Sequence, residues 1–259
     1  MKGFRTCIVL IVSVLAAYVL LALPNASGQR ALLPDRTSAR HATIWPQAAT
    51  PEPRAYFPIV FQGSGHNLLL NPDFEAEFRQ YLYYGSAIVA EEWNPWWVEQ
   101  GEDDPTWKNR MPEYKPAAPY EDRIWTGSNA QQYFTYYATH VGGIYQRVDG
   151  IVPDTRLCFS IRGHAWAGDG SDPGHSEGGG PMHMRVGIDA EGGVDPFSPT
   201  VIWSEEQDPL DVWSLFTVEA QANADQVTVY TWSAPENPTQ HNDVFWDHAS
   251  LVAVEPVSP

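Results

Sequence analysis

The feature that most constrains the fold is a series of short segments whose side chains alternate in character, each ended by a turn. In the last of them, His241–Val254, Phe245 and Leu251 fall on one parity, and His248 and Ser250 fall on the other. A period of two is typical of a β-strand that has one face on a hydrophobic core. The segment therefore predicts a closing strand that carries polar side chains on its second face.

Similar segments recur along the chain at regular spacing, and Gly and Pro together number 42 (20 plus 22). Short strands between many turns favour an all-β fold, in which eight to ten strands form a two-sheet antiparallel jelly-roll β-sandwich. The other predicted strands are 123–125, 129–137, 143–148, 156–166, 182–189, 200–204, 213–220 and 226–232. We expect 67–75 to be a first strand beside the last, because paired ends protect an antiparallel sandwich.

The N-terminus has the layout of a secretory signal peptide. Lys2 and Arg5 precede an apolar run, and small residues at Ala26 and Gly28 offer a cleavage site after residue 28. An uncleaved membrane anchor is the alternative. Residues 29–65 predict a flexible linker that contains a short apolar segment at 56–62, and residues 66–256 predict the folded domain. The expected location is extracellular or on the cell surface.

Charge and cysteine content narrow the partners. The formal charge is −17, and removal of residues 1–28 takes away Lys2 and Arg5 and no acid, which gives −19 by subtraction. Nucleic acid and anionic lipid are therefore poor partners, whereas divalent cations and neutral ligands remain possible. Cys158 is alone in the predicted mature chain, so no internal disulfide is expected.

Three predicted strands carry a distinctive set of outward side chains. If 156–166, 182–189 and 226–232 share one sheet, parity places seven residues on its outer face. They are Arg162, His164, Trp166, Arg185, Asp189, Tyr230 and Trp232. Aromatic rings with a few directional polar groups suit a sugar. The alternative is a second core covered by the loops at 102–122 and 168–181.

Other chemistry finds less support in the sequence. The acids of loop 168–181 lack the register of an EF-hand, and the histidines match no standard zinc spacing. No G-x-S-x-G elbow is present, and solvated acids account for the Glu residues near Trp. We therefore expect no catalytic residues. Glu75 and Asp247 could share one site if the first and last strands lie side by side.

Several motifs resemble one family. NLLLNPDFE, the W-x-x-W-W segment, SNAQQYF, GGIYQRVDGIVPDTRLCFSIRGHAW and DVFWDHASLVAV are similar to the jelly-roll carbohydrate-binding modules of the galactose-binding-like superfamily, over residues 67–254. The resemblance implies a structural calcium ion held by Glu75 and Asp247. His248 stands where the family often has a second Asp, which leaves one fewer anionic ligand. The linker and YFPIVFQ resemble the leader of secreted proteins from filamentous green bacteria.

The sequence thus predicts a secreted, non-catalytic protein that binds a polysaccharide or cell-surface glycan. A second hypothesis is a structural or adhesive surface protein that acts through protein–protein contacts in a cell-envelope or extracellular assembly. A third is a small polysaccharide-active enzyme, because sandwich folds host hydrolases and lyases as well.

Overall fold

The protein is described by a computed structural model that covers residues 42–43, 65–81, 87–119 and 121–254. The predicted signal peptide, the apolar segment at 56–62 and most of the predicted linker lie outside these residues. Within them, no helix has the length and apolar character needed to cross a membrane. Among the residues that the structure describes, the one helical element is the short 3-10 helix η1, Glu121–Arg123.

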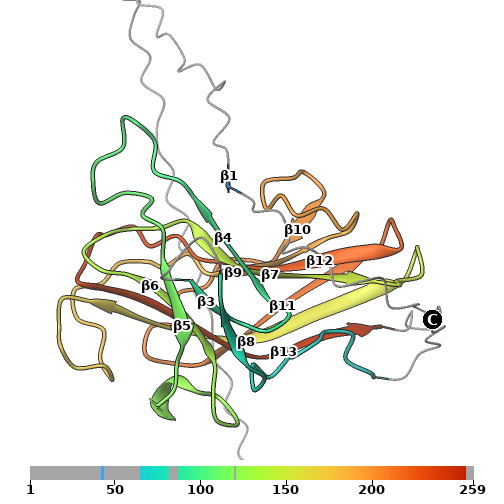
Figure 1. Cartoon of the computed structure of the whole chain (residues 1–259), viewed down its shortest axis with the longest axis horizontal. Coiled ribbons are helices and arrows are strands. Elements are labelled where there is room, and N and C mark those ends of the chain that lie inside the picture. Colours follow the sequence, from blue (N-terminus) through green and yellow to red (C-terminus); the bar gives the residue numbers. More distant parts are fainter. Residues whose placement is uncertain (1–41, 44–64, 82–86, 120, 255–259) are drawn as a thin grey trace, which may run out of the picture. The chain divides into compact units, whose positions relative to one another are not determined.

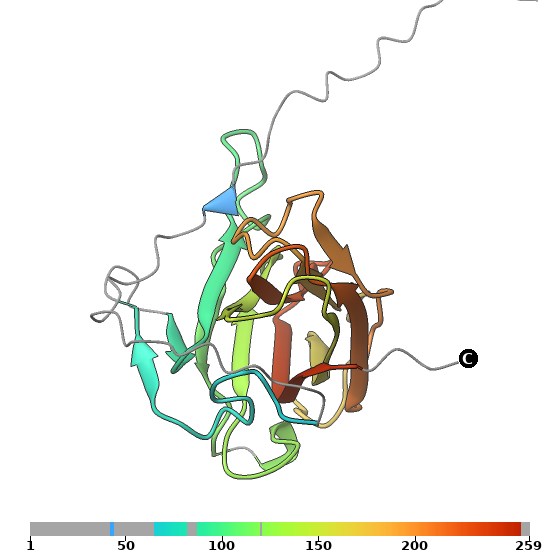
Figure 2. The same ribbon diagram turned by 90° about the vertical axis from the view of Figure 1, so that its right-hand side faces the viewer.

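Two antiparallel sheets form a jelly-roll sandwich (Figures 1 and 2). The six-stranded sheet runs in the order β1 (Ala42–Thr43), β4 (Asn94–Val98), β7 (Gly142–Asp149), β12 (Gln226–Trp232), β9 (Arg185–Asp189), β10 (Val201–Trp203). The five-stranded sheet runs in the order β11 (Ser214–Gln221), β8 (Arg156–Gly168), β13 (His241–Ala253), β6 (Gln131–Thr135), β5 (Glu113–Pro116). A separate pair is made of β2 (Phe78–Gln80) and β3 (Ile88–Ala90). The prediction of an all-β sandwich is confirmed.

The core lies between the two sheets and follows the predicted parity. Phe159 and Ile161 of β8 and Val186 and Ile188 of β9 are fully buried in one cluster. Alternate residues of a strand point to opposite faces, so their neighbours in sequence point away from the core. The pattern of the sequence therefore identifies the inner face of β8, β9 and β12 correctly. In β13 the prediction for Phe245 is wrong: a register shift between Asp247 and Ser250 puts Phe245 on the outer face, and Trp246 takes the core side.

The closing strand is confirmed as β13. The opening stretch of the folded domain, residues 67–75, contacts this strand. Leu68 N donates to Leu251 O at 2.8 Å, and Asn67 Nδ2 donates to Ala249 O at 2.9 Å. Residues 67–75 nevertheless form bends and turns, so the prediction of a strand there is wrong. Side-chain hydrogen bonds from Asn67 replace part of the backbone ladder, which lets the segment turn away from β13.

The condition that the three strands share one sheet, on which the predicted seven-residue face depended, is not met. β8, with Arg162, His164 and Trp166, belongs to the five-stranded sheet. β9 and β12 belong to the six-stranded sheet, so their outward residues lie on the opposite side of the sandwich. Parity specifies the face of a strand, but the pairing partners come from contacts between segments distant in sequence. β8 pairs with β11 and β13, whereas β12 pairs with β7 and β9.

Candidate functional site

The outer face of the five-stranded sheet carries a row of polar and aromatic side chains. Glu113 of β5 is opposite Phe134 of β6, which is opposite Asp243 of β13, and Asp243 is opposite Trp166 of β8. Residues opposite each other in antiparallel strands project from the same face. The topology thus brings together side chains that are up to 130 positions apart in the sequence (113 to 243).

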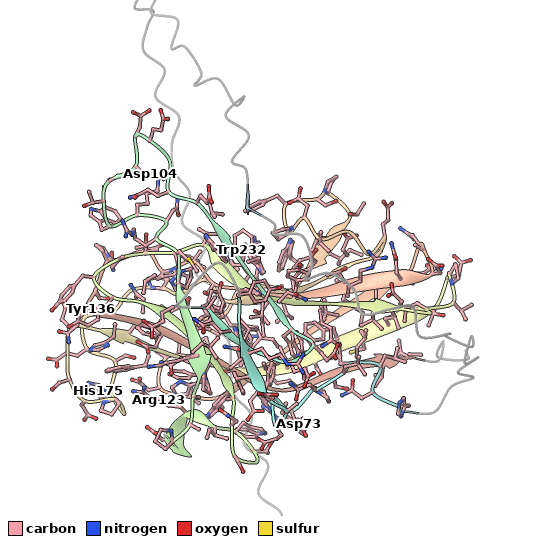
Figure 3. The ribbon with its side chains drawn as sticks, viewed as in Figure 1. Asp73, Asp104, Arg123, Tyr136, His175 and Trp232 are labelled. Atoms are coloured by element: carbon pink, nitrogen blue, oxygen red, sulfur yellow. The ribbon has the colours of Figure 1, made fainter. Side chains whose placement is uncertain are left out.

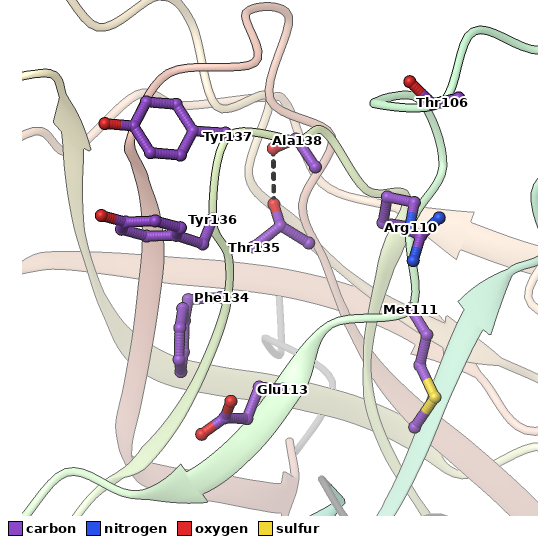
Figure 4. Close-up of a pocket in the computed structure, with 9 residues that line it drawn as sticks. All are labelled: Thr106, Arg110, Met111, Glu113, Phe134, Thr135, Tyr136, Tyr137 and Ala138. Atoms are coloured by element: carbon purple, nitrogen blue, oxygen red, sulfur yellow. Dashed lines mark hydrogen bonds between the residues drawn. The ribbon is translucent and has the colours of Figure 1, made fainter.

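At one end of this row lies a hollow of about 390 Å³, here called the tyrosine hollow (Figure 4). It is lined by Thr106, Arg110, Met111, Glu113, Phe134, Thr135, Tyr136, Tyr137 and Ala138. Tyr136 and Tyr137 are 56% and 54% exposed, and their ring centres are 4.6 Å apart in an edge-to-face arrangement. In Figure 4 these rings and Phe134 follow one another along one wall, facing Arg110 across the hollow. Such exposed aromatic surface is unusual unless it serves contact.

A buried polar network holds the turn that presents the two tyrosines. Thr135 Oγ1 donates to Ala138 O at 2.7 Å and lies 3.0 Å from His140 Nδ1. Asn242 Nδ2, from β13, donates to the same Ala138 oxygen at 2.9 Å. Burial lowers the pKa of His140 to about 3, so its ring is neutral near pH 7. Because buried hydrogen bonds fix the turn, the rings above it are pre-positioned for a ligand.

The opposite wall comes from the loop between β4 and β5, which is held by its own polar contacts. Asp104 accepts hydrogen bonds from Lys108 Nζ at 2.8 Å and from Asn109 Nδ2 at 3.0 Å. Arg110 N donates to Thr139 O at 2.9 Å, which ties this loop to the tyrosine turn. The Arg110 and Glu113 side chains are left without an internal hydrogen bond or ion pair to any described residue, so both can face a ligand. Their charges cancel.

A series of ring contacts connects Tyr136 with the side chains on the covered part of the same sheet face. Tyr136 meets His241 edge to face at 5.8 Å, and His241 stacks on Trp166 at 3.9 Å. The Arg123 guanidinium lies 4.8 Å from the Trp166 ring centre. Figure 3 shows Tyr136 and Arg123 in the same part of the domain, with Trp232 apart from them. Trp166 is buried, and its Nε1 donates to His175 O at 3.3 Å, so loop 168–181 covers it as the alternative prediction had it.

The outer face of the six-stranded sheet is closed. Tyr230 is fully buried and Trp232 is 8% exposed, in a second hydrophobic cluster with Trp96. The Arg185 guanidinium lies over the rings of Trp203 and Trp232, 4.7 and 4.3 Å from their centres. This face therefore forms a second core, and the predicted open groove is not found here.

Asp189 belongs to the same closed face. It is 1% exposed, and its Oδ1 accepts a hydrogen bond from Glu191 N at 2.9 Å. The segment between β9 and β10 contributes cover through Val194 and Phe197, whose ring centre is 6.3 Å from that of Trp96 and 5.4 Å from that of Trp232. This segment lies outside the loops that the sequence suggested.

Glu75 and Asp247 hold the same turn from two sides. Asp247 Oδ2 accepts hydrogen bonds from Trp125 N at 2.9 Å and Thr126 N at 3.0 Å. Glu75 Oε1 accepts from Ser128 N at 2.8 Å, and from Asn129 N at 2.9 Å. Together they grip residues 125–129, beside a hollow of about 460 Å³.

Backbone N–H groups donate to three of the four carboxylate oxygens of this pair, and a calcium site here stays a prediction. Asp247 is fully buried, and burial raises its pKa to about 6 although three backbone N–H groups lower it. Gly127 has φ +76°, and a side chain there would collide with the Glu75 carboxylate. No group of three His, Cys, Asp or Glu suited to a metal occurs in the described part of the chain. Two carboxylates with backbone carbonyls and water remain an oxygen set that calcium accepts.

Sequence reasoning missed the most exposed part of the site. Tyr136 and Tyr137 end a predicted strand, and adjacent aromatics in a strand must point to opposite faces unless the strand stops. The dipeptide at the strand's end was thus the available signal. Of the seven predicted ligand-binding residues, Arg162, His164 and Trp166 share the five-stranded face, and the role of each in binding stays a prediction.

Comparison with known proteins found similar solved structures. No protein-family model matches the chain, and no curated protein matches it. Carbohydrate-binding modules of the jelly-roll type are among its structural neighbours. TmCBM61, in complex with beta-1,4-galactotriose, is 14% identical with a TM-score of 0.45, over 73% of this chain and 99% of that chain.

Two further structures show the same range of similarity. The CBM22-1 xylan-binding domain from Paenibacillus barcinonensis Xyn10C is 11% identical with a TM-score of 0.44, over 76% of this chain and all of that one. The Stig cyclase Fisc from Fischerella sp. TAU is 16% identical with a TM-score of 0.45, over 74% and 98%. Likenesses of this size do not transfer a function, which must be argued from the site itself.

Proposed function

We propose that this protein is a secreted, non-catalytic glycan-binding protein that contacts a neutral sugar at the tyrosine hollow. The observation that carries the proposal is the pair Tyr136 and Tyr137, each more than half exposed and fixed on a turn with a buried polar anchor. The C–H faces of a pyranose pack on phenol rings, and hydroxyl groups exchange hydrogen bonds with nearby polar groups.

The charge balance of the hollow supports a neutral ligand. Arg110 and Glu113 offer one donor-rich and one acceptor-rich side chain, and their formal charges sum to zero. A sugar hydroxyl both donates and accepts, so it can satisfy each of them. An acidic or a basic ligand would gain from one of these side chains and be repelled by the other.

A calcium ion is the second part of the proposal. Glu75 and Asp247 would hold it, and the ion would supply positive charge beside a buried carboxylate. Its effect is structural, because the two acids join the turn at 125–129 to the opening stretch and to β13. The tyrosine hollow does not include either acid.

The test is a panel of soluble and insoluble neutral polysaccharides, assayed with the full chain by pull-down and calorimetry. Tyr136→Ala is expected to weaken binding about tenfold, or ~1.4 kcal/mol, because it removes a stacking surface. Trp125→Ala is the matched control, since Trp125 is 41% exposed and does not line the tyrosine hollow. It is expected to bind as the wild type does.

Two outcomes would overturn the proposal. One is a folded protein that binds no member of the panel. The other is a glycan complex that Tyr136→Ala and Tyr137→Ala leave unchanged. Light scattering on the same samples would then decide for the assembly hypothesis if the tyrosine variants alter the oligomer size, and release of reducing sugar would decide for an enzyme.

A further inference from the structure

A second hollow, of about 340 Å³, lies on the same outer face, over the side of the sheet where β8 pairs with β11. Its lining is Asp122, Trp125, His164, Pro173, Gly174, Asp211, Val212 and Trp213, and we call it the tryptophan hollow. None of these residues lines the tyrosine hollow. The two hollows therefore share no lining residue and are separate candidate sites.

Two indole rings and an imidazole form its aromatic surface. The ring centres of Trp125 and Trp213 are 6.1 Å apart at an interplanar angle of 57°. Trp213 lies 5.3 Å from His164, whose ring belongs to the predicted outward side of β8. Trp125 is 41% exposed and Val212 is 55% exposed, so the hollow opens to solvent.

Asp122 and Asp211 are the two carboxylates of the lining, in which neither Lys nor Arg occurs. Basic groups lie around it, since His175 Nδ1 is 3.8 Å from Asp211 and the charge of Arg123 acts on His164. His164 adds no charge near neutral pH, because burial lowers its pKa to about 4. Its Nδ1 is buried and has no hydrogen-bond partner among the described residues. In the tyrosine hollow, by contrast, Arg110 balances Glu113.

Internal contacts keep these groups in place. Asp211 accepts hydrogen bonds from Ser176 N at 2.6 Å and from Ser176 Oγ at 2.7 Å, which fixes its carboxylate at the rim. The Arg162 guanidinium lies 4.5 Å from the Trp125 ring centre, outside the lining. Arg162 thus occupies one face of this indole, so a ligand in the hollow would contact the other face or Trp213.

We propose that the tryptophan hollow binds a protonated amine, such as the ammonium group of an amino sugar or of a small organic cation. Indole faces attract cations, and carboxylates accept hydrogen bonds from an N–H group that carries positive charge. The neutral His164 ring adds no positive charge that would repel the ligand. This site is independent of the glycan contact at the tyrosine hollow.

Calorimetric titration of the full chain at about pH 6 and low salt tests the proposal with three probes: tetramethylammonium, glucosamine and N-acetylglucosamine. Near that pH an amine is protonated, whereas the acetylated amide carries no charge. We expect glucosamine to bind at least about tenfold more tightly than N-acetylglucosamine, with affinity falling as salt rises. Binding of tetramethylammonium would assign the cation alone as ligand, and its failure beside bound glucosamine would assign the amine's N–H donors.

Matched variants locate the effect. Trp125→Ala and Asp122→Asn should each weaken glucosamine binding about tenfold. Trp107→Ala, which is 39% exposed on another loop, and Asp103→Asn on that same loop should leave it unchanged. Equal binding of N-acetylglucosamine, no binding of glucosamine, or binding that survives Trp125→Ala would each overturn the proposal. Tyr136→Ala should retain this binding while it loses the neutral glycan, so the two sites fail separately.

Discussion

The outer faces of the two sheets carry similar side chains but differ in their exposure to solvent. On the six-stranded sheet, Trp96, Tyr230 and Trp232 are buried under the segment that carries Val194 and Val201. On the five-stranded sheet the middle is covered, but a hollow remains open on either side of it. Aromatic residues that face away from the main core thus stabilise one face and are available for contact on the other.

The difference lies in what covers each strand. A second core forms where a loop brings apolar side chains over the sheet, and an open hollow forms where the covering loops carry charged groups. The expectation that Trp232 contacts glycan therefore reverses into an expectation about stability. Four experiments test the contrast, in order of decreasing effect.

The largest effect is expected from Trp232→Ala. Its ring contacts Trp96 at 5.1 Å and Trp203 at 5.3 Å, so truncation leaves a cavity in the second core. We expect the free energy of unfolding to fall by about 3–5 kcal/mol, measured by denaturant titration. Trp125→Ala, on the open face, should change it by less than ~1 kcal/mol. Similar losses for the two variants would abolish the distinction between the faces.

Calcium should act at the end of the five-stranded face. A ligand that binds only the folded state at a hundred times its dissociation constant adds about 2.7 kcal/mol of stability. We expect calcium to raise the melting temperature of the wild type and chelator to reverse the rise. Asp247→Asn and Glu75→Gln should lose most of the response, and magnesium should give less. A wild-type melting temperature that is the same in calcium and chelator would leave both acids with their hydrogen-bonding role alone.

Asn242→Ala sharpens the claim that the tyrosine turn is pre-positioned. The amide donates to Ala138 O at 2.9 Å and to Asn237 O at 2.8 Å, so its loss leaves two carbonyls without this donor. We expect the free energy of unfolding to fall by about 1–3 kcal/mol. Glycan affinity should fall as well, although the side chain lies beneath the hollow and is buried. If the folded variant binds glycan with unchanged affinity, the pre-positioning of the turn does not contribute to binding.

The smallest effect is expected at His183, just before β9 of the six-stranded sheet. His183 lies between Glu236 at 2.8 Å and Glu206 at 3.0 Å, and Asp208 and Arg185 lie close by. The hydrogen bond to Glu236 raises the pKa of His183 above its ordinary 6.5, against partial desolvation. The folded state thus holds the proton more tightly, so this stability is complete below pH 6.5 and is lost as pH rises through the raised pKa.

His183→Gln should therefore cost up to about 1 kcal/mol in acid and less in alkali. Melting temperatures of the wild type and the variant, recorded from about pH 5.5 to 8.5, give the comparison. A difference that grows with rising pH would contradict the assignment. Glu219→Gln is a control for the loss of one surface carboxylate. Glu219 lies on β11 and forms an exposed ion pair with Arg156 of β8.

The alternation of apolar and polar residues along the sequence predicted much of the fold. Phe159, Ile161, Val186 and Ile188 face the core as their parity required, because an extended backbone leaves a side chain only two faces. β5 lay unrecognised in a predicted loop, since Glu113–Pro116 shows no apolar alternation. Its place at the sheet's edge comes from pairing with β6, which no local pattern reports.

By itself the sequence determined the class of fold and the inner face of most long strands. The tertiary structure alone decided which sheet each strand joins and which outer aromatics are covered. Local periodicity follows from backbone geometry, whereas strand partners and covering loops follow from contacts between distant segments. For that reason Tyr230 and Trp232 became core residues, and the unpredicted Tyr136 and Tyr137 became the exposed surface.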